Sequence, residues 1–113
     1  MIIAIAVNEN HLKAIIDPHF GRCSWYCIYD TQKQQHIFIE NPERYQQTNA
    51  GCNAADLLIT KGINMAIAGR FGSKVVELFR KQNIQMVIPE LQQTVEELIN
   101  QIKINSIKEL NYK

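Results

Sequence analysis

One short segment, Asp17-Pro18-His19-Phe20-Gly21-Arg22-Cys23, brings together side chains suited to ligand binding. It offers an imidazole, a guanidinium and a thiol within a few residues. Proline fixes its own φ, and Gly21 permits backbone conformations closed to other residues, so the segment is predicted to be a shaped loop. His19 is either a metal ligand or the donor of a hydrogen bond that holds its own turn.

The three cysteines extend this candidate site. An odd count with no export signal indicates free thiols, and the absence of a Cys-x-x-Cys motif leaves a thioredoxin-type or zinc-knuckle motif unsupported. Cys52 follows Gly51 at a predicted helix N-terminus, where the helix dipole and free N–H groups favour a thiolate ligand. Cys23 lies in the same loop as His19, residues 17–23, called the His19 loop below. It is either a third metal ligand or a small buried thiol, whereas Cys27 is predicted to pack inside a strand.

A second loop, residues 69–73, lies between a predicted buried strand and a predicted helix. Backbone N–H groups in such a strand-loop-helix turn form an anion site, with Gly69 and Gly72 in the turn and charge added by Arg70 and Lys74. The alternative is that Arg70 and Lys74 are ordinary solvated surface residues. Neither a dinucleotide-binding glycine fingerprint nor a Walker loop is present, so nucleotide binding is weakly supported.

The composition sets the broad class. With 113 residues and 46% hydrophobic residues, one domain over residues 1–113 is predicted, and a net charge of +1 favours neither nucleic acid nor an anionic membrane as partner. The longest apolar run, Ile2–Val7, is too short to span a bilayer, and no signal-type segment is seen, so a cytoplasmic protein is expected.

Hydrophobic periodicity predicts a hairpin followed by alternating helices and strands. The predicted strands are residues 2–7, 25–30, 36–40, 65–68 and 85–88, and the predicted helices are 52–61, 73–82 and 94–102. Residues 94–97 fit a capping box. With the first strand in the middle of a five-stranded mixed α/β sheet, the loops 17–23, 49–53 and 69–73 should meet at one rim, where open α/β sheets usually bind ligands.

These features together resemble the dinitrogenase iron-molybdenum cofactor biosynthesis family, over residues 1 to about 102. The resemblance is carried by the His19-Phe20-Gly21-Arg22 turn before an aromatic strand, the strand end Tyr29-Asp30, the exit Glu40-Asn41-Pro42, and Ile67-Ala68-Gly69 before a helix. The family includes the NifX and NifY accessory proteins and the C-terminal domain of NifB. The resemblance implies a ribonuclease H-like three-layer sandwich.

The resemblance also implies a function without catalysis. The better understood members of the family bind, hold or hand over iron-sulfur or molybdenum-containing clusters. The partners that this implies are an apo-metalloprotein acceptor or a cluster-assembly protein. The expected metal ligands are His19, Cys52 and Cys23, and the expected anion contacts are Arg22, Gly51, Gly69, Arg70, Gly72 and Lys74. The chain departs from the family pattern at Arg70-Phe71 and at Ala50-Gly51-Cys52, so its cluster is expected to differ.

Two other functions are alternatives to a cluster carrier. A ribonuclease H-like nuclease needs clustered carboxylates that hold magnesium, one of them in the first strand, and Ile2–Val7 has none. A metal-free regulatory or scaffold domain would bind a protein partner through the loop of residues 43–48, and the sequence leaves this alternative open.

Overall fold

The first strand, β1 (Ile2–Val7), lies at the centre of a five-stranded mixed sheet in the order β3-β2-β1-β4-β5. This computed structural model describes residues 1–45, 49–90 and 92–104. On one side β1 pairs antiparallel with β2 (Trp25–Asp30), which pairs antiparallel with β3 (Gln35–Glu40). On the other side β1 pairs parallel with β4 (Met65–Ile67), and β4 pairs parallel with β5 (Gln85–Val87).

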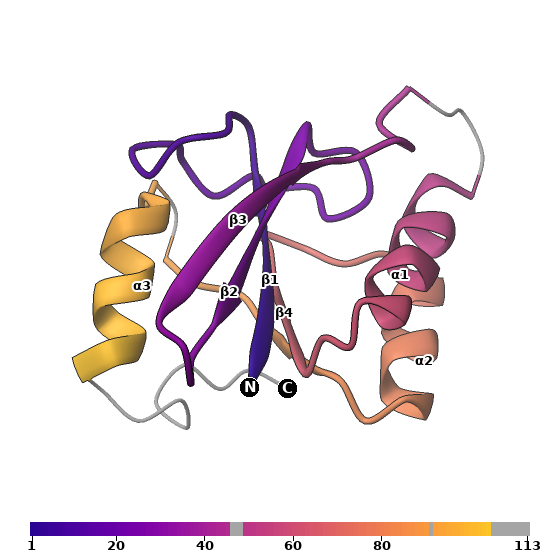
Figure 1. Ribbon diagram of the computed structural model, residues 1–113. Helices are drawn as coiled ribbons and strands as arrows, with labels where there is room; N and C mark the ends of the chain where they lie inside the picture. The colour runs from indigo at the N-terminus through magenta and orange to yellow at the C-terminus, as the bar shows by residue number, and fades with distance from the viewer. Residues whose placement is uncertain (46–48, 91, 105–113) are drawn as a thin grey trace.

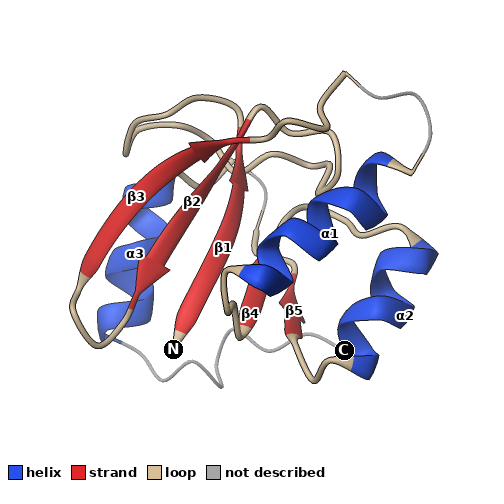
Figure 2. Ribbon diagram, turned by 45° about the vertical axis from the view of Figure 1, so that its right-hand side comes forward, coloured by secondary structure: helices blue, strands red, loops and turns tan. Residues whose placement is uncertain are grey.

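Helices cover both faces of this sheet (Figures 1 and 2). Helices α1 (Ala50–Thr60) and α2 (Ser73–Lys81) lie side by side on one face, and α3 (Val95–Ile104) covers the other. The expected three-layer α/β sandwich of the ribonuclease H-like kind is therefore confirmed. None of the helices in the described ranges is both long and apolar enough to cross a membrane.

Alternation along β1 explains why two helices share one face. Successive side chains of a strand point to opposite faces, so Ala4 and Ala6 face α1 and α2, whereas Ile3, Ile5 and Val7 face α3. All five side chains are fully buried. Small side chains on the first face leave room for two helices, and the larger side chains fill the space beneath the single helix α3.

The helix ends follow local signals in the sequence. The capping box is confirmed: the Thr94 N–H donates to Glu97 Oε1 at 2.9 Å and the Glu97 N–H donates to Thr94 Oγ1 at 3.1 Å. Gly62, expected just after α1, has a φ of 79°, which favours glycine.

Some predicted boundaries shift. Helix α1 begins at Ala50, before the predicted start, and α3 extends to Ile104. Strands β4 and β5 each end one residue earlier than predicted. Residues 105–113, whose structure the sequence left ambiguous, lie outside the described residues.

Cys23 and Cys27 predict a loss of stability at alkaline pH. Both thiols are fully buried, and burial raises the pKa of each to about 12. Between the ordinary pKa near 9.0 and that value the unfolded chain binds fewer protons than the folded one, so stability is full below this window and falls as pH rises through it. Each thiol should contribute a slope of about 1 kcal/mol per pH unit.

Urea titrations at pH 8, 9 and 10 would measure this slope, with Cys27→Ala as the comparison. The variant should be less stable at pH 8 because it loses packing, yet its stability should fall less steeply with pH. Equal slopes for the two proteins would contradict the assignment of a buried neutral thiol at Cys27.

Candidate functional site

Two adjoining pockets lie at the rim where the three predicted loops meet. The histidine pocket, of about 190 Å³, is lined by residues of the His19 loop together with others from α1 and α2: His19, Phe20, Gly21, Arg22, Gly51, Arg70, Gly72 and Val75. The cysteine pocket, of about 330 Å³, is lined mainly by the first turns of α1 and α2: Arg22, Asn49, Ala50, Gly51, Cys52, Gly72, Ser73, Lys74 and Val75. The predicted convergence of the loops is confirmed, and Arg22 lines both pockets.

Backbone hydrogen bonds attach the His19 loop to the sheet. The Asp17 N–H donates to the Ala6 carbonyl at 2.7 Å, at the end of β1. The Gly69 N–H donates to the Asp17 carbonyl at 3.0 Å, and His19 then runs parallel to Arg70 in an isolated bridge. The loop therefore continues the sheet beyond the C-terminal ends of β1 and β4. This places His19 beside the loop that follows β4.

Glycines allow this loop to touch its neighbours backbone to backbone. A Cβ on Gly21 would lie 2.5 Å from the Gly51 Cα, and a Cβ on Gly69 would lie 2.5 Å from the Pro18 Cα. The sequence interpretation of Gly21, a backbone conformation closed to other residues, was wrong. Gly62 is the glycine with positive φ in the described chain, and Gly21 is required by the close approach of α1.

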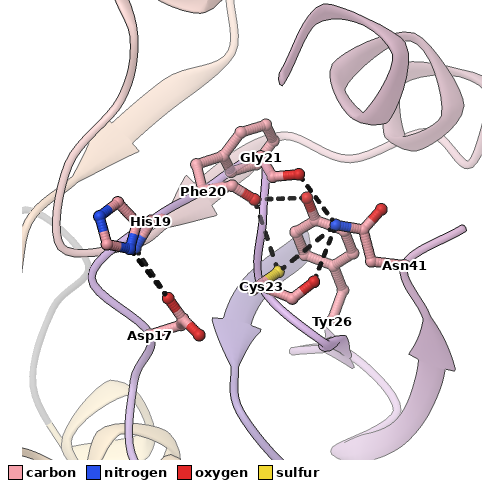
Figure 3. Close-up of polar contacts among 7 residues, drawn as sticks. All are labelled: Asp17, His19, Phe20, Gly21, Cys23, Tyr26 and Asn41. Atoms are coloured by element: carbon pink, nitrogen blue, oxygen red, sulfur yellow. Dashed lines mark hydrogen bonds and ion pairs between the residues drawn. The ribbon is translucent and has the colours of Figure 1, made fainter. Parts of the chain in front are cut away.

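Buried side chains satisfy the loop's carbonyl groups (Figure 3). Asn41, only 1% exposed, donates from Nδ2 to the Gly21 carbonyl at 3.0 Å and to the Cys23 carbonyl at 2.9 Å. The Tyr26 hydroxyl donates to the Phe20 carbonyl. Because unsatisfied buried carbonyls are costly, these bonds fix the loop in one shape.

His19 combines a held backbone with a half-exposed ring. Its N–H donates to Asp17 Oδ1 at 2.8 Å, so the turn is held by the backbone of His19. Its ring atom Nδ1 lies 3.8 Å from the same oxygen, beyond hydrogen-bond distance, and the side chain is 49% exposed. The ring is thus positioned by its backbone and available to a ligand in the histidine pocket.

The two candidate cysteines occupy different environments. Cys52 is partly exposed, in the first turn of α1, and lines the cysteine pocket. Cys23 is fully buried, lines neither pocket, and donates its S–H to the Phe20 carbonyl at 3.4 Å. Burial raises the Cys23 pKa to about 12, so its thiol keeps its proton at neutral pH. These surroundings match the competing interpretation, a small buried thiol.

The structure does not assemble a complete set of metal-ion ligands from the predicted residues. Within the described ranges, no three His, Cys, Asp or Glu side chains form a group able to hold a metal ion. It brings His19 and Cys52 to adjoining pockets and leaves Cys23 behind the loop. Gly69 supports the loop through its contact with Pro18 and is not part of either pocket lining.

The N-termini of α1 and α2 both line the cysteine pocket. Neither the α1 cap, Asn49, nor the α2 cap, Gly72, makes a side-chain hydrogen bond, and neither helix has an acidic residue in its first turn. Helix α3, in contrast, has a capping box and two acidic residues in its first turn. Arg22 and Lys74 line the same pocket, and the Glu43 carboxylate accepts from Asn53 Nδ2 in the first turn of α1. Unpaired N–H groups at helix N-termini are in general suited to anions.

Sequence reasoning missed the residues that support the site from behind. Asn41 was predicted only as part of a strand exit, and Tyr26 only as a strand residue, yet both hold the His19 loop. Ser73 and Val75 also line the pockets without having been singled out. An asparagine before a proline at a strand end was the available signal for Asn41, but its partners come from a distant loop.

Solved structures of other proteins share this arrangement of strands and helices. The apo form of the orange protein from Desulfovibrio gigas matches with a TM-score of 0.82 and 22% sequence identity, covering 89% of this chain and 85% of that one. An NMR structure of a candidate NifB protein from Thermotoga matches with a TM-score of 0.78 and 23% identity, covering 92% and 88%. These similarities establish the fold. No curated protein matches the chain.

The family follows from the sequence itself. The family model described as dinitrogenase iron-molybdenum cofactor matches residues 1–104, and the chain belongs to this family. The resemblance found in the sequence is therefore confirmed. Membership supports a role in handling a nitrogenase-type cofactor or cluster, and the family's accessory proteins are carriers rather than catalysts.

The close backbone contacts predict which glycines can be replaced. Gly21→Ala and Gly69→Ala should each lower the free energy of unfolding by at least about 2 kcal/mol, because the added methyl group would overlap backbone atoms that cannot move aside. Gly72→Ala is the matched control. A Cβ there meets nothing within 4 Å, so its cost should stay below about 1 kcal/mol.

Chemical denaturation of the three variants would test this order. Equal stability losses at Gly21, Gly69 and Gly72 would contradict a loop held by backbone contact.

Proposed function

We propose that this protein is a non-catalytic carrier that binds, stores or transfers an anionic metal-sulfur cluster, either iron-sulfur or molybdenum-containing. The cluster would sit across the histidine and cysteine pockets. One observation supports the proposal most. The N-termini of α1 and α2, neither of which has a side-chain cap, line the same pocket as Cys52, and His19 lines the adjoining pocket.

The donor set suits a preassembled cluster. A sulfur and an imidazole nitrogen bind soft and borderline metals. Two donors are fewer than the four that complete a tetrahedral metal-ion site, but a cluster carries sulfide ligands of its own and needs few from the protein. Loose attachment through Cys52 and His19 also suits a protein that must later release its cargo.

Charge would supply the remaining affinity. Arg22 lines both pockets, Arg70 lines the histidine pocket and Lys74 lines the cysteine pocket. These side chains and the backbone N–H groups of the first turns of α1 and α2 would neutralise the charge of a sulfide-rich anion. A dipole contribution at such an exposed site is about 0.3 to 1 kcal/mol, so each charged group should matter less than a direct ligand.

The partners follow from the cargo. A cluster must arrive from an assembly protein and leave to an apo-metalloprotein, so we infer transient contacts with both at this rim. Residues 43–45 lie close to the start of α1, because the Glu43 carboxylate accepts from Asn53 Nδ2 at 3.3 Å. This part of the chain presents Tyr45, 81% exposed, with the Arg44 guanidinium 4.8 Å from the centre of its ring.

The same surface supports a second candidate, the metal-free regulatory or scaffold domain. An exposed tyrosine beside an arginine is the kind of surface that protein partners bind. Residues 46–48 of the loop predicted to bind such a partner lie outside the described residues.

Ligand variants should separate the two candidates. Cys52→Ala and His19→Ala should each weaken binding of an anaerobically reconstituted cluster by at least about tenfold, because each removes a direct metal bond. Arg22→Gln should weaken it about two- to fivefold. Metal analysis and visible spectra after gel filtration would measure retention of the cluster.

Cys27→Ala and His11→Ala are the matched controls. Cys27 is buried beneath α3, and His11 contacts Glu9 and lines neither pocket, so both variants should retain the cluster. Unchanged metal content in the Cys52→Ala, His19→Ala double variant would refute this site. If no metal-loaded form can be prepared under reducing conditions, the scaffold domain becomes the better account. Transfer to an apo-acceptor without consumption of a substrate would distinguish a carrier from an enzyme.

A further inference from the structure

Strand β3 forms an edge of the sheet and lines neither of the two pockets at the rim. It stands at one end of the strand order, and within the described residues no other strand pairs with its outer side (Figure 2). Most of its residues are exposed, including Ile37, whose exposed fraction is 58%. An edge of this kind presents a row of unpaired backbone N–H and C=O groups.

One hydrogen bond identifies which residues present those groups. The Asn41 N–H donates to the Ser24 carbonyl at 3.0 Å, just beyond the β2–β3 ladder. Antiparallel strands alternate between hydrogen-bonded and non-bonded pairs, so Ile39, Ile37 and Gln35 direct their backbone groups to β2. His36, Phe38 and Glu40 therefore direct theirs away from the sheet.

The edge carries few of the features that usually prevent pairing, and its acidic side chain, Glu40, lies at the end of the strand in an ion pair with Arg44 at 3.1 Å. Natural edge strands are protected by proline, lysine, a bulge or an inward-pointing charge. The β3 sequence, Gln-His-Ile-Phe-Ile-Glu, contains neither proline nor lysine, and its six residues pair with β2 in continuous register without a bulge. The strand is also longer than the opposite edge strand, β5 (Gln85–Val87).

We propose that β3 pairs antiparallel with β3 of a second copy of this chain, about a twofold axis at Phe38. Phe38 then lies opposite Phe38 of the second copy, and His36 lies opposite its Glu40. All of these are residues whose backbone groups point outward, so each facing pair exchanges two backbone hydrogen bonds. The two sheets join into one.

In this register the β3 side chains of one copy are complementary to those of the other copy. On the face covered by α3, the two Phe38 rings meet at the axis. The His36 imidazole N–H can donate to the Glu40 carboxylate opposite, which has a second oxygen beside the one that Arg44 of its own chain contacts. The His36 ring is already placed against Phe38, with ring centres 5.5 Å apart. On the other face Ile37 lies opposite Ile39 of the second copy, which covers the most exposed apolar side chain of the strand.

This association is independent of the proposed cluster site. The residues that line the histidine and cysteine pockets come from the loops and helix ends at the rim, and none belongs to β3. Both pockets stay open in the dimer. Because the contact rests on single strands, its area falls at the low end for protein interfaces, and association is expected at high protein concentration.

Amide hydrogen exchange measured at low and high protein concentration provides the sharpest test. The Ile37 and Ile39 amides, bonded to β2, should exchange slowly at both concentrations. The His36, Phe38 and Glu40 amides should exchange rapidly in dilute protein and gain at least about tenfold protection when the protein is concentrated, in step with dimer formation seen by sedimentation. Ile37→Lys, at an exposed position, should abolish both changes while the chain stays folded.

A charge exchange tests the register. His36→Glu should remain monomeric, because each facing pair would place two carboxylates opposite each other. Glu40→Lys should associate more weakly than the unaltered protein, because it removes the carboxylate that His36 faces. An equimolar mixture should form heterodimers, because in one facing pair the introduced carboxylate lies opposite the introduced ammonium group, and in the other His36 faces Glu40 as before. Thermal unfolding of both variants would verify that they fold.

Several outcomes would overturn the proposal. These are a sedimentation coefficient independent of concentration, a dimer that persists in Ile37→Lys, or a mixture that fails to associate. Protection of the outward amides in dilute monomer would mean that another segment of the same chain covers the edge. None of these results would bear on cluster retention, so the carrier proposal and the dimer proposal can fail separately.

Discussion

The candidate site depends on direct contact between the His19 loop and two other backbones. Gly21 lies against Gly51 at the start of α1, and Gly69 lies against Pro18, at separations that leave no room for a Cβ. These contacts bring the loop, the N-terminus of α1 and the loop before α2 to one rim. Asn41 and Tyr26 then satisfy the loop's carbonyls from behind, so its outer side, with His19 and Arg22, faces the pockets.

The same contact sets the electrostatics of the rim. Because α1 and α2 begin beside the loop, their uncapped N–H groups open onto the cysteine pocket, with Arg22 and Lys74 nearby. The chain caps α3 with Thr94 and Glu97, so the missing caps on α1 and α2 are specific to the rim. A rim of this kind offers positive charge, a sulfur and an imidazole, which suits the anionic cluster of soft or borderline metals that we propose as its ligand.

Local signals in the sequence were enough to predict most of the strands and helices, and the family resemblance implied the three-layer sandwich. The apolar run of β1, the capping box at Thr94 and the glycine after α1 each depend on neighbouring residues only, and each is observed. The site was predicted in part, because strand order brings the three loops together. The role of Gly21, the burial of Cys23 and the hydrogen bonds of Asn41 depend on distant segments that no local pattern reveals.

The proposed function requires that a metal-sulfur cluster binds at this rim. A crystal structure of the anaerobically loaded protein, with anomalous scattering recorded at the absorption edge of the bound metal, would locate the cluster. We expect metal density across the two pockets, within about 2.0 to 2.3 Å of Cys52 Sγ or a His19 ring nitrogen. Metal density at another surface, with Cys52 and His19 unliganded, would contradict it.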